Sequence, residues 1–213
     1  SESTLKIKKL VNLAKKNNLP ALAITDNNNM FGVFEFAQEC VSNNIQPIIG
    51  SSVNLLDIRE KDKISQISFL VKNETGYKNL IYLSSISYLN KGFDIGITIK
   101  DLENHSEGLF CFLGGEYNPL MILNNENKNI DELIIIFKKL FKENLLFELQ
   151  RINDYEIDSF ENVLIKKSNE FNVPLVGTNN IKFGEPEEFA AHDALLCVAQ
   201  KTTINNGSRK TSN

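Results

Sequence analysis

The sequence contains no tryptophan, three cysteines and two histidines among its 213 residues. The cysteines, Cys40, Cys111 and Cys197, lie far apart inside apolar segments and form no CxxC pair. Their odd number and scattered positions argue against a disulfide framework and favour a reducing compartment. We therefore expect all three to be buried as small hydrophobic residues, and the protein to be cytoplasmic.

Long apolar runs and an excess of positive charge are also missing. No run approaches the roughly 18 residues of a membrane span, and the first residues lack the hydrophobic region of a signal peptide. The formal net charge is −4, and the only arginines are Arg59, Arg151 and Arg209. A duplex-binding module usually has a basic face and a pI above about 9. The sequence therefore predicts neither a membrane protein nor strong direct DNA binding.

Short apolar segments alternate with amphipathic ones along most of the chain. This alternation predicts βα units and a mostly parallel sheet, either a doubly wound sheet or a (β/α) barrel. The predicted strands span residues 21–24, 47–50, 64–71, 109–113, 145–149 and 174–178. The predicted helices run from Ser3 or Thr4 to Asn17 and over residues 31–42, 77–89, 130–141, 156–171 and 186–199.

Polar residues gather where the predicted strands end, as in 25–27, 51–52, 114–115, 150–151 and 178–180. In a barrel the carboxyl ends of all strands meet at one rim, where active sites lie. A doubly wound sheet would instead show a glycine-rich phosphate turn, and neither GxGxxG nor GxxxxGK[ST] occurs. We favour the barrel, with the doubly wound sheet as the alternative.

Several motifs, in matching order and spacing, resemble the PHP (polymerase and histidinol phosphatase) domain family. The similarity is closest to the PHP domains that open bacterial DNA polymerase III alpha subunits. It covers a domain over residues 1–204, followed by a linker or tail over 205–213. The motifs are LPALAITD (19–26), NMFG (29–32), QPIIG (46–50), NETGYKNL (73–80), FELQR (147–151), PLVGTN (174–179) and AHDALLC (191–197).

The resemblance implies a distorted seven-stranded (β/α) barrel whose opening strand is absent from this sequence. In active members a cluster of zinc or manganese-like ions at the carboxyl rim hydrolyses phosphoesters and, in some polymerases, removes mispaired 3′ ends. Closely spaced dications need anionic or imidazole ligands to offset their repulsion. An active metal-dependent phosphoesterase or 3′-5′ exonuclease is therefore the alternative function, and it depends on whether these ligands are present.

Most ligands that the resemblance implies are replaced in this chain. Only Asp26 keeps an ionisable oxygen, while amides and hydroxyls are weak zinc ligands. We therefore assign no catalytic and no metal-binding residue. The vestigial ligand positions are Asp26, Asn27, Ser52, Gln66, Gly115, Ile152, Asn180 and Lys182.

Lys182 places a positive charge where the resemblance puts a cation, which at about 4 Å opposes metal binding by roughly 4 kcal/mol at an effective dielectric near 20. We expect Asp26 and Lys182 to form an ion pair, with Gln66 and Asn180 completing the hydrogen bonds. The alternative is that both charged side chains point to solvent.

Neither histidine restores a metal site. His105 lies in a predicted turn, where we expect it to be solvated. His192 and Asp193 are adjacent on a helix, so their side chains point about 100° apart and a structural role is favoured. Phe31, Phe34 and Phe36 have a spacing that is typical of aromatic residues in a core between helix and barrel, so we expect them to be buried. The alternative is that they include an exposed contact.

The resemblance further implies a parent protein that extends DNA primers as a nucleotidyltransferase, with magnesium in its later polymerase domain and no cofactor in this segment. It implies two partners, the polymerase core of the same chain and the separate proofreading exonuclease subunit. We thus expect a structural and docking domain. The alternatives are an active phosphoesterase and a barrel that binds some other small ligand at its rim.

Overall fold

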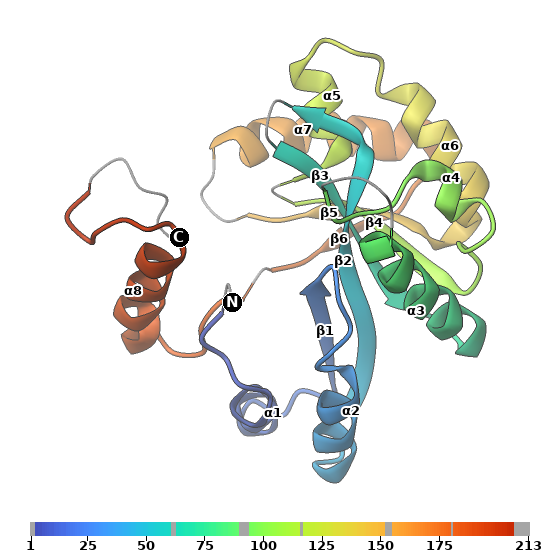
Figure 1. Cartoon of the computed structure of the whole chain (residues 1–213). Coiled ribbons are helices and arrows are strands. Elements are labelled where there is room, and N and C mark those ends of the chain that lie inside the picture. The colour runs from blue at the N-terminus through green and yellow to red at the C-terminus, as the bar shows by residue number, and fades with distance from the viewer. Residues whose placement is uncertain are drawn as a thin grey trace.

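The computed structural model describes residues 3–60, 63–89, 94–115, 117–151, 155–179 and 181–206. Six strands form a single curled sheet, a half-barrel with helices packed on its outer side (Figure 1). The sheet order is β1 (Ala21–Asn27), β2 (Gln46–Glu60), β3 (Lys63–Val71), β4 (Leu109–Gly114), β5 (Leu145–Leu149) and β6 (Leu175–Gly177). The helices are α1 (Ile7–Lys16), α2 (Val33–Ser42), α3 (Glu74–Leu89), α4 (Ile99–Leu102), α5 (Pro119–Asn125), α6 (Asp131–Phe141), α7 (Tyr155–Phe171) and α8 (Phe189–Ala199).

One strand runs against the others. The pairs β1–β2, β4–β5 and β5–β6 are parallel, whereas β3 is antiparallel to both β2 and β4. Only residues 61 and 62 separate β2 from β3, and a parallel pair needs a crossover of about a dozen residues. The prediction of a mostly parallel sheet is therefore right for three pairs and wrong for β3.

The sheet remains open between β1 and β6. The six predicted strands are all present, although β2 is much longer than predicted. The part of the chain that the structure describes contains no seventh strand, so the seven-stranded closed barrel is not confirmed. The boundary between the domain at 1–204 and the tail at 205–213 stays a prediction, because residues 207–213 lie outside the described part.

Alternating side chains bury the outer face of the sheet. Val53, Phe69, Cys111 and Phe147 are fully buried there beneath α3, α5, α6 and α7. Side chains that alternate with them, such as Ser52 and Ser68 or Phe112 and Leu146, face the concave side and remain partly exposed. The outer face thus supplies most of the core, and the concave face carries polar and apolar side chains that remain partly exposed.

A second, smaller core joins α1 and α2 to β1. Val11, Ile24, Val33 and Phe36 are among its buried members. Phe36 is fully buried as predicted for this aromatic cluster, whereas Phe31 and Phe34 are 87% and 74% exposed. The expectation that most of these aromatic residues fill the core is therefore wrong for two of the three, since they lie on the outer side of α2.

All three cysteines are buried free thiols, which confirms that expectation. Burial raises the pKa of the Cys111 thiol well above its ordinary value, so this group stays protonated. Of the helices described, none combines the length and apolar character that crossing a bilayer requires.

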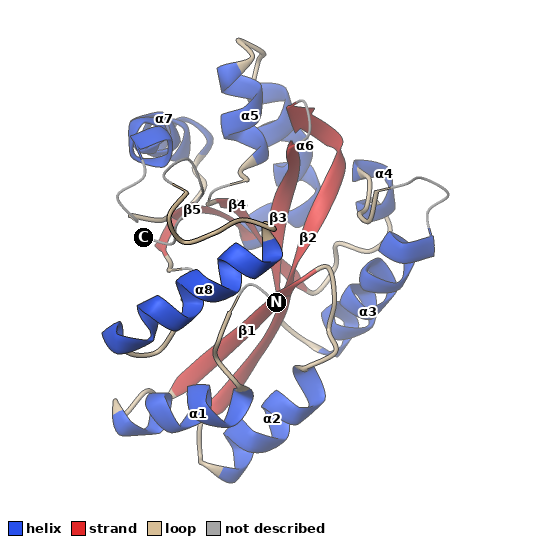
Figure 2. Cartoon of the chain, turned by 60° about the vertical axis from the view of Figure 1, so that its left-hand side comes forward, coloured by secondary structure: helices blue, strands red, loops and turns tan. Residues whose placement is uncertain are grey.

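The two open edges of the sheet are linked by polar contacts rather than by a strand. The backbone carbonyl of Lys182, beyond β6, accepts hydrogen bonds from the Thr4 backbone N–H (3.2 Å) and the Ser3 hydroxyl (2.7 Å). On α1, Lys9 pairs with Glu188, and Lys16 lies 3.3 Å from Glu185. The segment before β1 therefore holds the segment after β6 in place (Figure 2).

Replacing Glu188 by Gln should lower the midpoint of urea unfolding at neutral pH, because Lys9 and the Gly184 N–H lower the pKa of this carboxyl from its ordinary value. A lowered folded-state pKa stabilises above the unfolded-state pKa, and the stabilisation disappears as pH falls through the folded value. The wild type and E188Q should therefore differ above about pH 5 and converge in more acidic buffer. The exposed Glu103→Gln variant is the control, and a gap that persists at low pH would contradict this account.

Candidate functional site

The register of the first three strands places the vestigial positions on the concave face. Asn27 pairs with Ser52, and Ser52 pairs in turn with Ser68 of β3. Gln66 lies opposite Asn54, one row further along the same face. Because directly paired residues project to the same side of a sheet, these side chains form neighbouring rows at the rim.

Neutral groups at this part of the rim bond to one another. The hydroxyls of Ser52 and Ser68 are 2.7 Å apart, and the Gln66 amide donates to Asn54 Oδ1 over 3.2 Å. The Asn54 backbone N–H donates to Asn28 Oδ1 over 2.8 Å. Short side chains that satisfy each other in this way stabilise the strand ends and present no converging anionic ligands.

A second polar group lies at the ends of β5 and β6. The Glu148 carboxylate accepts hydrogen bonds from the Thr178 hydroxyl and from Gln150 Nε2, the latter over 3.0 Å. Gly115, in a left-handed conformation with φ of 72°, brings the end of β4 against the Gln150 side chain. The vestigial ligand position at Gly115 therefore serves as a turn.

Glu148 is a rim residue that was not predicted from the sequence. It pairs with Gly114 of β4 and with Val176 of β6, so it occupies the centre of the second polar group. The signal was present in the alternation of strand 145–149, where residues 145 and 147 are apolar and belong to the core. Glu148 follows residue 147 directly, so its side chain had to face the side opposite to these core residues.

Asp26 does not face this rim. Strand alternation turns it to the side opposite Asn27, and its Oδ2 lies close enough to Gly32 that an added Cβ there would be 3.3 Å away. The residue as a whole is exposed, but its carboxyl end is partly desolvated, which raises the pKa of Asp26. The position with the one retained carboxylate therefore lies beside the start of α2.

The prediction of an ion pair between Asp26 and Lys182 is wrong, because the ion pairs between described residues do not include it. The physical reason is twofold. Asp26 points toward α2, and the Lys182 backbone is held by Ser3 and Thr4 beyond the end of β6. Of the two residues proposed to complete this arrangement, Gln66 bonds to Asn54 and Asn180 lies outside the described residues, as does Ile152.

The two histidines lie apart from the rim groups. His105 is not simply solvated, because its ring stacks on Tyr82 with centroids 3.9 Å apart and its Nδ1 is 3.2 Å from Asn79 Oδ1. His192 is 1% exposed and its ring lies 5.6 Å from that of Phe183. Both therefore have packing roles, as favoured for His192.

The rim residues do not fit the metal cluster that the fold resemblance implies. Within the described ranges, no group of three or more His, Cys, Asp and Glu side chains could hold a metal ion. Glu148 is a single carboxylate already bonded to two neutral groups, and Ser52, Gln66 and Asn54 are weak ligands for zinc. No hydrolytic step through metal ions can be derived from these side chains.

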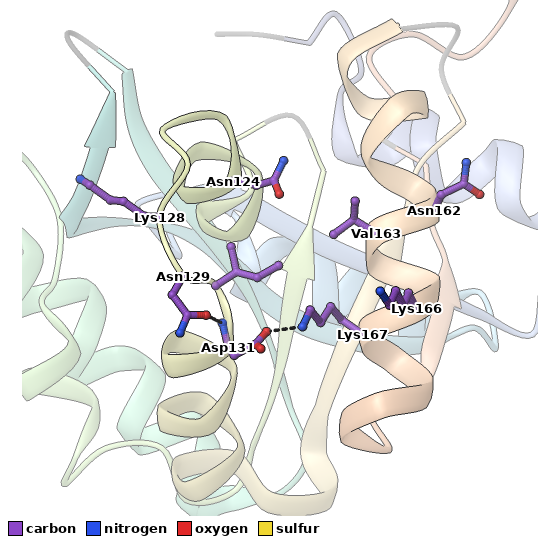
Figure 3. A pocket seen from close by; sticks show the side chains of 9 residues that line it. Asn124, Lys128, Asn129, Asp131, Asn162, Val163, Lys166 and Lys167 are labelled. Carbon is purple, nitrogen blue, oxygen red and sulfur yellow. Dashed lines mark hydrogen bonds and ion pairs between the residues drawn. The ribbon is translucent and has the colours of Figure 1, made fainter.

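A separate groove of about 460 Å³ lies in the helical layer, between the α5–α6 connection and α7 (Figure 3). Its lysines are largely neutralised, since Lys167 pairs with Asp131 and Glu170 and Lys128 pairs with Glu126. Its walls therefore carry little net charge to select an anionic ligand, and the groove is not part of the rim.

Comparison with known proteins gives a consistent family. Residues 1–152 match the model of the PHP domain. Relatives named DNA polymerase III subunit alpha include those of Rickettsia conorii, 36% identical over 99% of this chain, and Borreliella burgdorferi, 34% identical over 99%. The chain spans 18% and 20% of the lengths of these relatives.

Solved structures share the fold at low sequence identity. A protein from Bifidobacterium adolescentis assigned as a metal-dependent phosphoesterase superposes with a TM-score of 0.54 at 11% identity, covering 87% of this chain and 85% of that one. An amidohydrolase from Chromobacterium violaceum gives a TM-score of 0.53 at 11% identity, covering 88% and 85%. These similarities establish the architecture. The chemistry of the rim has to be inferred from the residues of this chain.

Removing both hydroxyls of the Ser52–Ser68 pair should be less costly than the sum of the single losses. In a double-mutant cycle with Ser52→Ala and Ser68→Ala, we expect a coupling of about 1 kcal/mol in the free energy of unfolding. Ser85→Ala, whose hydroxyl bonds only within α3 to the Ile81 carbonyl, should be additive with Ser52→Ala. Equal additivity in both cycles would show that the pair contributes nothing to the rim.

Proposed function

This chain belongs to the PHP domain family, and on that premise we propose that it serves a bacterial replicative DNA polymerase as a scaffold and docking domain without hydrolytic activity of its own. Its relatives named DNA polymerase III subunit alpha are similar to it over nearly its whole length. In such a protein this segment is the N-terminal region, and the rest of the polypeptide packs against it.

The observation that carries this proposal is the neutral hydrogen bonding of the rim. Ser52 with Ser68 and Gln66 with Asn54 use their polar atoms on each other. Dications a few ångströms apart repel one another, and only anionic or imidazole ligands offset this repulsion. A rim of paired hydroxyls and amides supports strand ends far better than it supports a metal cluster.

The alternative is an active metal-dependent phosphoesterase or 3′-5′ exonuclease, which the fold similarity to an assigned phosphoesterase keeps in view. Among the described rim residues, such an enzyme would have Glu148 as its one carboxylate to gather ions, and Thr178 and Gln150 would have to give up their hydrogen bonds to it. One carboxylate cannot offset the charge of two or three dications, so we rank this function second.

Nucleotidyl transfer and its magnesium ions belong, in this proposal, to other parts of the polymerase polypeptide, and no catalytic residue is assigned here. The partners proposed are the polymerase core of the same polypeptide and a separate proofreading exonuclease subunit. The net charge of −4 favours protein partners over direct DNA binding.

Elemental analysis of the purified intact protein should find zinc and manganese far below one ion per chain. With either metal added, we expect no hydrolysis of bis-p-nitrophenyl phosphate or of a mispaired 3′ primer end above the background of a Glu148→Gln variant. A metal-bearing PHP phosphoesterase provides the positive control. Two or more bound ions per chain, with hydrolysis that a chelator abolishes and E148Q lacks, would establish the alternative function.

The docking role predicts that the intact polymerase subunit binds the proofreading exonuclease of the same organism through this domain. Lysine cross-linking followed by mass spectrometry should join the exonuclease to lysines of residues 3–206. Cross-links measured at low and high protein concentration would separate a specific complex from random collision. If the subunits bind but every cross-link lies in other domains, the docking role does not belong to this one.

A further inference from the structure

The last helix of the described chain belongs to neither hydrophobic core, and α8 lies apart from the helices that cover the sheet (Figure 1). Within the described ranges, no residue after Val173 is a member of either core. Of the described elements, only the 3-10 helix η2 (Pro186–Glu188) has an extensive contact with α8. Regions with few shared apolar contacts open at a lower free energy than the core of a protein. We call residues 185–199, which comprise η2 and α8, the strap.

Only one side of the strap helix is covered. His192, Asp193 and Cys197 are buried on this side, and the Phe183 ring lies 5.6 Å from the ring of His192. The opposite side is open to solvent, and Val198 there is 77% exposed. The buried Cys197 thiol therefore reports on whether the strap is seated, because opening of the strap would expose it.

Backbone contacts place the start of the strap against α1. The Lys182 carbonyl, shortly before the strap, accepts hydrogen bonds from the Ser3 hydroxyl and the Thr4 N–H. Gly184 follows so close to α1 that an added Cβ would lie 2.4 Å from Leu13 Cδ1. These contacts anchor the chain at residues 182–184 and keep the strap within reach of the lysines on α1.

The strap itself is attached to α1 by ion pairs. Glu188 pairs with Lys9, and Glu185 lies 3.3 Å from Lys16. The side chains of Lys16 and Glu185 are 72% and 44% exposed, so this pair is open to competing ions. Exposed ion pairs contribute little free energy and are weakened further by salt.

Opposite charges face each other along this whole contact. Residues 6–16, which span α1, contain five lysines and no acidic residue, whereas residues 185–188 contain three glutamates and no basic residue. Their attraction falls as salt rises, because the screening length is about 10 Å at 0.1 M and about 3 Å at 1 M ionic strength. The closed position of the strap therefore depends on ionic strength, unlike the packing of the two apolar cores.

We propose that the strap is an electrostatic latch. It is closed on α1 at low ionic strength and opens as a unit, with the sheet still folded, when salt or a charged partner competes for its ion pairs. Opening frees Lys9 and Lys16 on α1 together with Glu185 and Glu188 on the strap. A partner that binds either set of charges therefore favours the open state, because a ligand shifts an equilibrium toward the state that it binds more tightly.

The three buried cysteines provide the test, because each lies in a different part of the molecule. Cys111 belongs to the main core, Cys40 to the smaller core and Cys197 to α8. The intact protein is treated with N-ethylmaleimide under native conditions, and mass spectrometry follows the labelling of each cysteine relative to its rate in concentrated urea. Cys197 should react at least about tenfold faster than Cys40 and Cys111. Its rate should rise at least about threefold between about 0.1 M and about 1 M salt.

Charge reversal tests the ion pairs themselves. Lys16→Glu and Glu185→Lys should each speed the labelling of Cys197 at low salt by about two- to fivefold, as expected for an exposed pair. The double variant K16E/E185K restores opposite charges and should return the rate to that of the wild type. Lys78→Glu is the matched control, since it breaks an exposed ion pair with Glu74 on α3 and should leave the rate of Cys197 unchanged.

Two results would overturn the latch. Equal protection of all three cysteines at both salt concentrations would mean that the strap opens only with the whole domain. Fast labelling of Cys197 that neither salt nor charge reversal changes would mean that α8 moves without being held by charge. A variant that also exposes Cys111 has unfolded, and the salt dependence of the wild type then decides alone. The docking role does not depend on the latch, because binding of the exonuclease is measured separately.

Discussion

The register of β1, β2 and β3 is the constraint on which the concave face depends. It aligns Asn27, Ser52 and Ser68 in one row and Asn54 with Gln66 in the next, so neutral groups meet neutral groups. A shift of one residue would send these side chains to the outer face and bring apolar neighbours such as Val53 and Ile67 into water. The burial of those apolar residues thus holds the polar rim in place.

The same alternation explains why neither Asp26 nor Glu148 provides a free carboxylate at the rim. Asp26 keeps its carboxylate but lies on the other side of β1, beside α2. Glu148 lies at the rim but gives its oxygens to Thr178 and Gln150. Hydrogen bonds between short neutral side chains each contribute only about 1 kcal/mol, yet together they satisfy strand ends that would otherwise expose unpaired polar groups. The domain therefore has the architecture of its family, with a rim whose hydrogen bonds stabilise the strand ends.

Much of the fold could be predicted from the sequence because burial imposes periodicity. All six strands follow from short apolar runs, and the family from ordered motifs. The reversal of β3 was missed because an apolar strand reads the same in either direction, and only the two-residue connection to β2 signals it. Phe34 was misplaced because α2 has apolar residues on both sides, and periodicity alone does not say which side is covered. The Asp26–Lys182 pair failed because proximity at a rim was inferred without following side-chain direction.

The backbone at Gly114 and Gly115 restricts which side chains this part of the rim can carry. The φ of 72° at Gly115 is open to glycine and strained for any other side chain, by roughly 1–2 kcal/mol. Gly114 next to it has no room either, since a Cβ would lie 2.3 Å from Glu148. Any side chain introduced at this turn would therefore be held in an unfavourable backbone conformation. A new ligand at this turn would therefore require a change in the backbone as well as in the side chain.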